Sequence, residues 1–67
     1  MQNYTLYVYA RRAASVEAVQ VVVADASRAR AMADRLLSES SRRIAVEVTQ
    51  MGRWLFTVQP KAAKQHG

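Results

Sequence analysis

The 67-residue sequence contains no cysteine, two glycines and one proline. Without cysteine the chain cannot form disulfides or the thiolate zinc sites of fingers and ribbons. Its glycines are Gly52 and Gly67, so it has neither a phosphate-cradling loop nor a dinucleotide-binding fingerprint, because both need several glycines close together. These absences exclude the common nucleotide-binding motifs, and we expect no cofactor.

Residues that could perform acid–base chemistry are also scarce. The only histidine, His66, lies in residues 61–67, which follow Pro60 and are predicted to be a disordered tail. A histidine in a tail is not held within hydrogen-bond reach of a nucleophile. The five carboxylates are spread along the chain, with no spacing that gathers several of them around a cation. We therefore expect no enzyme activity, no metal site and no small-molecule substrate.

The sequence has no long apolar segment. The apolar run nearest the N-terminus, YTLYVY at residues 4–9, is too short and too polar for a signal-peptide core or a membrane-spanning helix. No basic region precedes it. The sequence therefore predicts a cytoplasmic protein with no membrane partner.

Two segments in the first third of the chain show the alternation of β-strands. Residues 4–9 alternate between two faces, with Tyr4, Leu6 and Val8 on one and Thr5, Tyr7 and Tyr9 on the other. Residues 19–24, VQVVVA, align Val19, Val21 and Val23 on one side. Nearly continuous valines are also typical of a central strand covered on both faces.

After residue 25 the apolar period becomes that of a helix. Asp25 is a good N-cap, and strong helix formers follow it without glycine or proline. One stripe of this helix is apolar and is predicted to face a sheet: Ala26, Ala29, Met32, Ala33, Leu36 and Leu37. Arg30–Asp34 and Arg35–Glu39 are spaced as surface ion pairs, worth about 0.2–0.5 kcal/mol each.

The last strand pair turns at the Met51-Gly52 dipeptide, and two registers can be written for it. A two-residue loop places Val48 opposite Leu55. A three-residue loop over 50–52 places Val48 opposite Trp54 and makes one face wholly apolar, with glycine at the third loop position, where a left-handed conformation is needed. We favour the three-residue loop. It places Trp54, the only tryptophan, in the core under the helix against Leu36 or Leu37, whereas the alternative makes Trp54 a ligand-binding platform.

The predicted element order is ββαββ. The sequence therefore indicates an α+β fold over residues 1–60, a single small domain with a four-stranded, largely antiparallel sheet and one helix on one face. The order of the strands in space stays open.

The sheet face opposite the helix is the first candidate interaction surface. It is predicted to be unusually apolar, and its candidate interface residues are Tyr7, Tyr9, Val22, Leu55 and Thr57. A chain this short buries a small core, and self-association is a common remedy. The leading hypothesis is a non-enzymatic interaction module that forms a homodimer through this face.

The second candidate surface is basic. The formal net charge is +5, and eight of the ten basic residues are arginines, whose guanidinium fork suits phosphate. The candidate phosphate contacts are Arg11, Arg12, Arg42, Arg43 and Arg53. The alternative hypothesis is a nucleic-acid-binding accessory protein that adds base stacking on Tyr7 or Tyr9. A solvated arginine rim that reflects only genome composition would produce the same counts.

Overall fold

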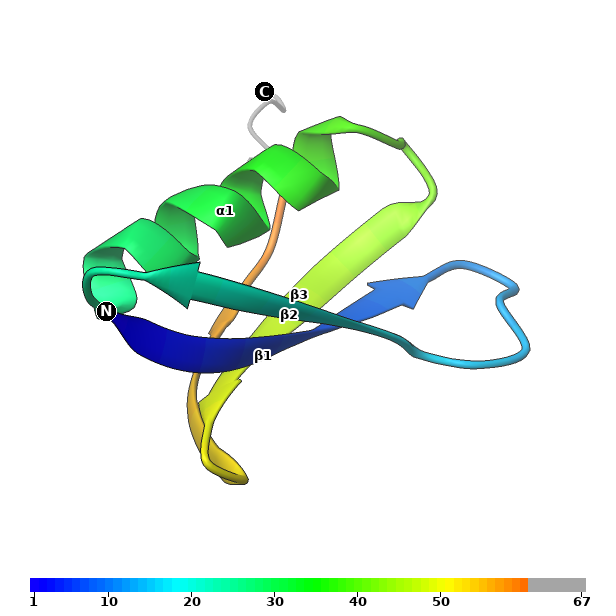
Figure 1. Ribbon diagram of the computed structural model, residues 1–67. Coiled ribbons are helices and arrows are strands. Elements are labelled where there is room, and N and C mark those ends of the chain that lie inside the picture. The colour runs from blue at the N-terminus through cyan, green and yellow to red at the C-terminus, as the bar shows by residue number, and fades with distance from the viewer. Residues whose placement is uncertain (61–67) are drawn as a thin grey trace.

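The computed structural model describes residues 1–60, and the predicted tail over 61–67 lies outside the described residues. The elements are β1 (Gln2–Ala10), β2 (Glu17–Val23), α1 (Ala26–Ser38), β3 (Arg43–Gln50) and β4 (Arg53–Val58). They form one four-stranded sheet with the helix lying across one side of it (Figure 1). The predicted ββαββ order and α+β fold class are confirmed.

The strand order in the sheet is β2-β1-β3-β4, and every neighbouring pair is antiparallel. Strands β2 and β3 therefore run in the same direction with β1 between them, and α1 connects them. The valine-rich strand β2 lies at an edge, so the prediction of a central strand covered on both faces was wrong. The single helix covers one face only, and Val22 on the other face is 58% exposed.

The core fills the space between α1 and the sheet. It consists of Tyr4, Leu6, Val8, Ala29, Ala33, Leu37, Val46, Val48 and Val58. The predicted inner faces of β1 and α1 are therefore confirmed. The helix begins as expected, because the Asp25 carboxylate accepts a hydrogen bond from the backbone N–H of Arg28 at 3.0 Å.

The predicted ion pairs along the helix are not among those formed within residues 1–60. The guanidinium of Arg30 lies over the ring of Phe56, 4.9 Å from its centroid, rather than beside Asp34. Glu39 accepts from Arg43 at 3.2 Å rather than from Arg35. Phe56 is less exposed than Asp34, and Arg43 is less exposed than Arg35. Shielding from water strengthens the interaction of a charged group with its partner.

The β3–β4 turn contains two residues, so the predicted three-residue loop was wrong. Gln50 pairs with Arg53, and the turn residues Met51 and Gly52 have φ angles of 52° and 79°. Two successive positive φ angles define a type I′ turn, whose twist matches that of the strands it connects.

A bulge in β4 then changes the register once more. Thr49 pairs with Trp54, but the next pair along β3 is Val48 with Phe56, so Leu55 is the extra residue. Neither predicted register has this interruption. An extra residue reverses the alternation of the strand, and Phe56 and Val58 therefore face the core although the loop is one residue shorter than expected.

Trp54 lies on the side of the bulge that faces away from the helix. It is 59% exposed, so its predicted place in the core was wrong. Its indole Nε1 donates a hydrogen bond to Oγ1 of Thr57 at 3.0 Å. Leu55, predicted for the outer face, is half-buried and packs against the core.

Candidate functional site

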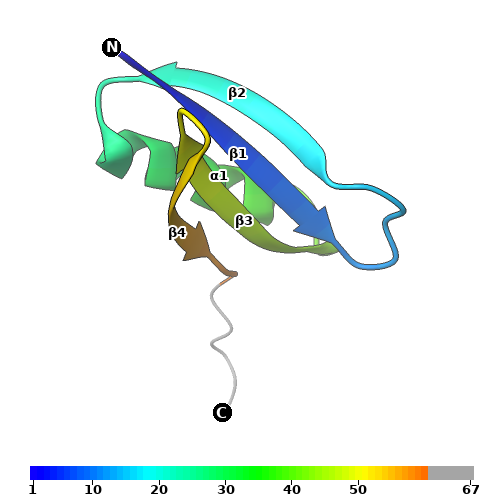
Figure 2. The same cartoon turned by 90° about the horizontal axis from the view of Figure 1, so that it is seen from below.

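The sheet surface opposite α1, which we call the open face, is uncovered within the described chain (Figure 2). Three aromatic side chains belong to it. Tyr7 and Tyr9 alternate with the buried Val8 on β1, and Trp54 pairs with Thr49 on β4. Strand β3 separates β1 from β4, and Trp54 lies across from Thr5, so the backbone positions of Tyr7 and Trp54 are roughly 12 Å apart.

The polar groups around these rings are paired with one another. The Tyr9 hydroxyl donates to Oε1 of Glu47 at 2.6 Å. This hydrogen bond, with smaller effects of burial and of the Glu47 charge, raises the pKa of Tyr9. The Thr49 hydroxyl donates to the backbone oxygen of Thr5 at 2.9 Å. With Trp54 bonded to Thr57, two of the three rings are held in fixed orientations by their own polar atoms.

Arginines gather at one end of the sheet. Arg11, Arg12 and Arg42 line a hollow of about 270 Å³ where β1 ends and the chain enters β3. The backbone N–H of Arg11 donates to the carbonyl oxygen of Arg42 at 2.8 Å, which ties the two loops together. None of the three takes part in the ion pairs found within residues 1–60. The hollow therefore concentrates positive charge that the described part of the chain does not neutralise.

The backbone at this hollow is strained. Arg12 has a φ angle of 59°, in the left-handed region that costs a non-glycine residue about 1–2 kcal/mol. Strain of this kind persists where the surrounding structure holds it, and it is common at binding sites.

The other two predicted phosphate contacts lie elsewhere. Arg43 has a side chain only 20% exposed, and its Nη1 donates to the carbonyl oxygen of Leu36 at 2.7 Å. It also pairs with Glu39 at 3.2 Å and with Glu17 at 3.5 Å. Arg43 therefore holds the C-terminal end of the helix against the sheet. Arg53 begins β4 at the turn, which lies at the opposite end of the sheet from the hollow (Figure 1).

The structure thus keeps four of the predicted interface residues on the open face: Tyr7, Tyr9, Val22 and Thr57. It removes Leu55 and adds Trp54, which sequence reasoning placed in the core. One feature of the sequence favours an outward Trp54: Met51-Gly52 fits a two-residue turn ending in glycine, which is a preferred hairpin connection. It places Thr49 opposite Trp54.

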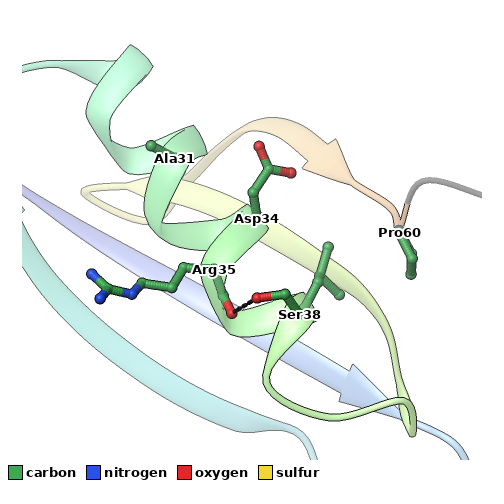
Figure 3. Close-up of a pocket in the computed structure, with 6 residues that line it drawn as sticks. Ala31, Asp34, Arg35, Ser38 and Pro60 are labelled. Carbon is green, nitrogen blue, oxygen red and sulfur yellow. Dashed lines mark hydrogen bonds between the residues drawn. The ribbon is translucent and has the colours of Figure 1, made fainter.

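A hollow larger than that of the arginines lies elsewhere, and its side chains do not form a reactive group. It measures about 610 Å³ and lies between the outer side of α1 and Pro60, lined by Ala31, Asp34, Arg35, Leu37, Ser38 and Pro60. Figure 3 shows that the side chains of Asp34 and Arg35 point away from each other. The hydroxyl of Ser38 donates to the backbone oxygen of Arg35 at 2.8 Å, within the last turn of α1.

Two further findings apply to residues 1–60. No three histidine, cysteine, aspartate or glutamate side chains there come close enough together to hold a metal ion. The one helix is too short and too polar to cross a membrane.

Comparison of the chain with protein-family models, with curated proteins and with solved structures finds no match.

Proposed function

We propose that this protein is a non-enzymatic interaction module that binds single-stranded nucleic acid on its open face. One observation carries the proposal. Tyr7, Tyr9 and Trp54 share a single uncovered sheet surface, and Arg11, Arg12 and Arg42 line a hollow at the end of β1, the strand that carries both tyrosines.

The aromatic rings suit unpaired bases. Trp54 and Tyr7 are 59% and 37% exposed, so their faces are accessible to a flat ligand. Stacking of one base on such a ring is worth about 1–3 kcal/mol and tolerates any base. The bond from Trp54 to Thr57 holds the indole in place before binding, which reduces the entropy lost on association. Bases are accessible for stacking only outside a duplex, so the proposed ligand is single-stranded.

The arginine hollow suits the phosphates of the same strand. Each guanidinium can donate two parallel hydrogen bonds to a phosphate, and Arg11, Arg12 and Arg42 have no carboxylate partner within residues 1–60. The net charge of +5 adds long-range attraction.

The corrected register favours this ligand over a second copy of the chain on the open face. With Leu55 turned to the core, the rings stand among Thr5, Glu47 and Thr57. A dry interface there would have to remove water from the Glu47 carboxylate, which is costly without a cationic partner. A strand of nucleotides can leave that carboxylate in contact with water.

Trp54 provides a direct test, because it is the only tryptophan in the chain and lies on the proposed surface. Titration with a short pyrimidine oligonucleotide at low salt should quench its emission. Since three arginines contact phosphate, log affinity should fall with log salt with a slope of about −2, from about 0.7 per phosphate for single strands. A Trp54→Ala variant, followed with a labelled oligonucleotide, should bind about 5–150-fold more weakly, which corresponds to the loss of one stacked base.

The matched charge variants are Arg42→Ala in the hollow and Arg35→Ala on the helix. Both remove one arginine, but only Arg42→Ala should weaken binding and reduce the salt slope by about 0.7. Equal losses in the two variants would reduce the effect to overall charge and contradict the proposed site. Unchanged Trp54 emission at low salt would contradict the proposal altogether.

A further inference from the structure

The two edges of the sheet differ in how well they are protected from pairing with another strand. The edge strand β4 has six residues, begins with Arg53, contains the bulge at Leu55 and is followed by Pro60. Short length, charge, bulges and proline all discourage pairing with another chain.

The other edge strand, β2, has a charge only at its first residue, Glu17, and it has no bulge and no proline. It is seven residues long and pairs with β1 from Gln2↔Val23 to Val8↔Glu17 without a bulge. Between Ala18 and Val23 it contains no charge and no proline. Its far side has no neighbouring strand within residues 1–60, so a row of backbone donors and acceptors faces outward. The chemistry that satisfies such a row is another β-strand.

The sequence of β2 suits antiparallel pairing with a second copy of the same strand. In an antiparallel pair of two β2 strands centred on Gln20, Gln20 meets Gln20, Val19 meets Val21, and Ala18 meets Val22. Within residues 18–22 every apolar residue then faces an apolar one and the amide faces an amide, while Glu17 at each end of the pair meets Val23. No like charges meet, although the chain carries a net charge of +5.

We infer that β2 pairs antiparallel with β2 of a second copy, centred on Gln20, to give a continuous eight-stranded sheet. The two-fold axis of such a pair is perpendicular to the sheet, so both helices lie on one side and both open faces on the other. Val19, Val21 and Val23 are only half-buried at the rim of the core. The second copy would cover them, which is how self-association enlarges the core of a small domain. The inference does not depend on the nucleic-acid proposal.

Charged substitutions at the centre of the β2–β2 interface test the proposed dimer without nucleic acid. One variant carries Gln20→Lys and Val22→Lys, and the other carries Gln20→Glu and Val22→Glu. Both positions are exposed, so each variant should remain folded. By sedimentation equilibrium at micromolar concentration the parent should be a dimer. Each variant alone should dissociate at least about tenfold more readily, because like charges meet across the interface.

Mixing the two variants should restore a dimer that contains one copy of each, as identified by native mass spectrometry. The control carries Ala31→Lys and Met51→Lys, two exposed sites away from β2, and should keep the mass of the parent. A monomeric parent, a lysine variant that keeps the parent's dimer, or a mixture that forms no heterodimer would each overturn the inference.

Discussion

The two hairpins of this sheet show how differently a strand pair can be encoded. The first hairpin, β1–β2, keeps one register over seven residue pairs and has a six-residue connection, 11–16. The second hairpin, β3–β4, turns in two residues and is interrupted by a bulge within two pairs of the turn. Alternation along the sequence therefore describes the faces of the first hairpin and misassigns those of the second.

The turn and the bulge together place Trp54 and Phe56 on opposite faces of the sheet. Because Leu55 is extra, Trp54 faces outward while Phe56 faces the core, although the two are separated by an even number of positions. Bulges are frequent beside binding sites because they redirect a side chain without changing the rest of the sheet. Here the two-residue turn places Trp54 opposite Thr49 on the open face, and the bulge turns Phe56 from that face to the core.

The strongest test of the bulge compares two alanine variants in β4. Phe56→Ala should reduce the free energy of unfolding by about 3 kcal/mol, the low end for a buried aromatic, because the ring packs against the core and under Arg30. Trp54→Ala should cost less than about 1 kcal/mol, because the indole is 59% exposed. Urea unfolding followed by circular dichroism measures both.

Val48→Ala is the control for a fully buried residue in the same hairpin, and it should behave like Phe56→Ala. If Trp54→Ala unfolds the chain while Phe56→Ala is tolerated, β4 has the opposite face inward and the register described above is wrong.

The features that were predicted correctly from the sequence are the local ones. Period and caps are local, so the faces of β1, the helix and its Asp25 cap were predicted correctly. A bulge depends on how β4 pairs with β3, and no residue of the RWLFTV segment marks it. The strand order and the use of Arg43 depend on contacts between residues distant in the chain, such as Arg43 with Glu17, and periodicity contains no information about these.

The side chain of Arg43 connects the two hairpins, whereas its neighbour Arg42 does so only through its backbone oxygen. Arg43→Ala removes the bonds to Leu36, Glu39 and Glu17 and should reduce the free energy of unfolding by about 1–3 kcal/mol. Arg42→Ala should leave it within about 0.5 kcal/mol, as for other surface substitutions. Urea unfolding separates the two, and an equal loss in both would show that Arg43 has no special structural role.

The connections of both hairpins contain a strained residue that is not glycine, Arg12 in the first and Met51 in the second. Asparagine tolerates positive φ, so Met51→Asn and Arg12→Asn should each raise the free energy of unfolding by up to about 1 kcal/mol. Gly52→Ala should lower it by about 1 kcal/mol through the backbone alone, since no atom lies within 4 Å of the added Cβ.

Only Arg12→Asn should also weaken nucleic-acid binding, because Met51 is far from the hollow. Thermal unfolding and an oligonucleotide titration on each variant measure the two effects. A gain in stability at Arg12 with unchanged binding would remove this residue from the proposed site.

The smallest expected effect is confined to alkaline pH and concerns the bond between Tyr9 and Glu47, which connects β1 of the first hairpin to β3 of the second. This bond raises the pKa of Tyr9 above its ordinary value of about 10, so the folded state holds the phenol proton more tightly than the unfolded state does. The stabilisation is therefore complete below about pH 10 and is lost as the pH rises through the pKa of Tyr9 in the folded protein.

In a Glu47→Gln variant the pKa of Tyr9 should return toward its ordinary value, because the carboxylate is the main cause of the shift. The difference in unfolding free energy between parent and variant should be constant from neutral pH to about pH 10 and should shrink above it. Phenolate absorbance, taken as the difference between the parent and a Tyr9→Phe variant, follows the titration of this one residue. An unchanged Tyr9 titration in Glu47→Gln would show that the bond is absent in solution, and the two hairpins would then be connected without it.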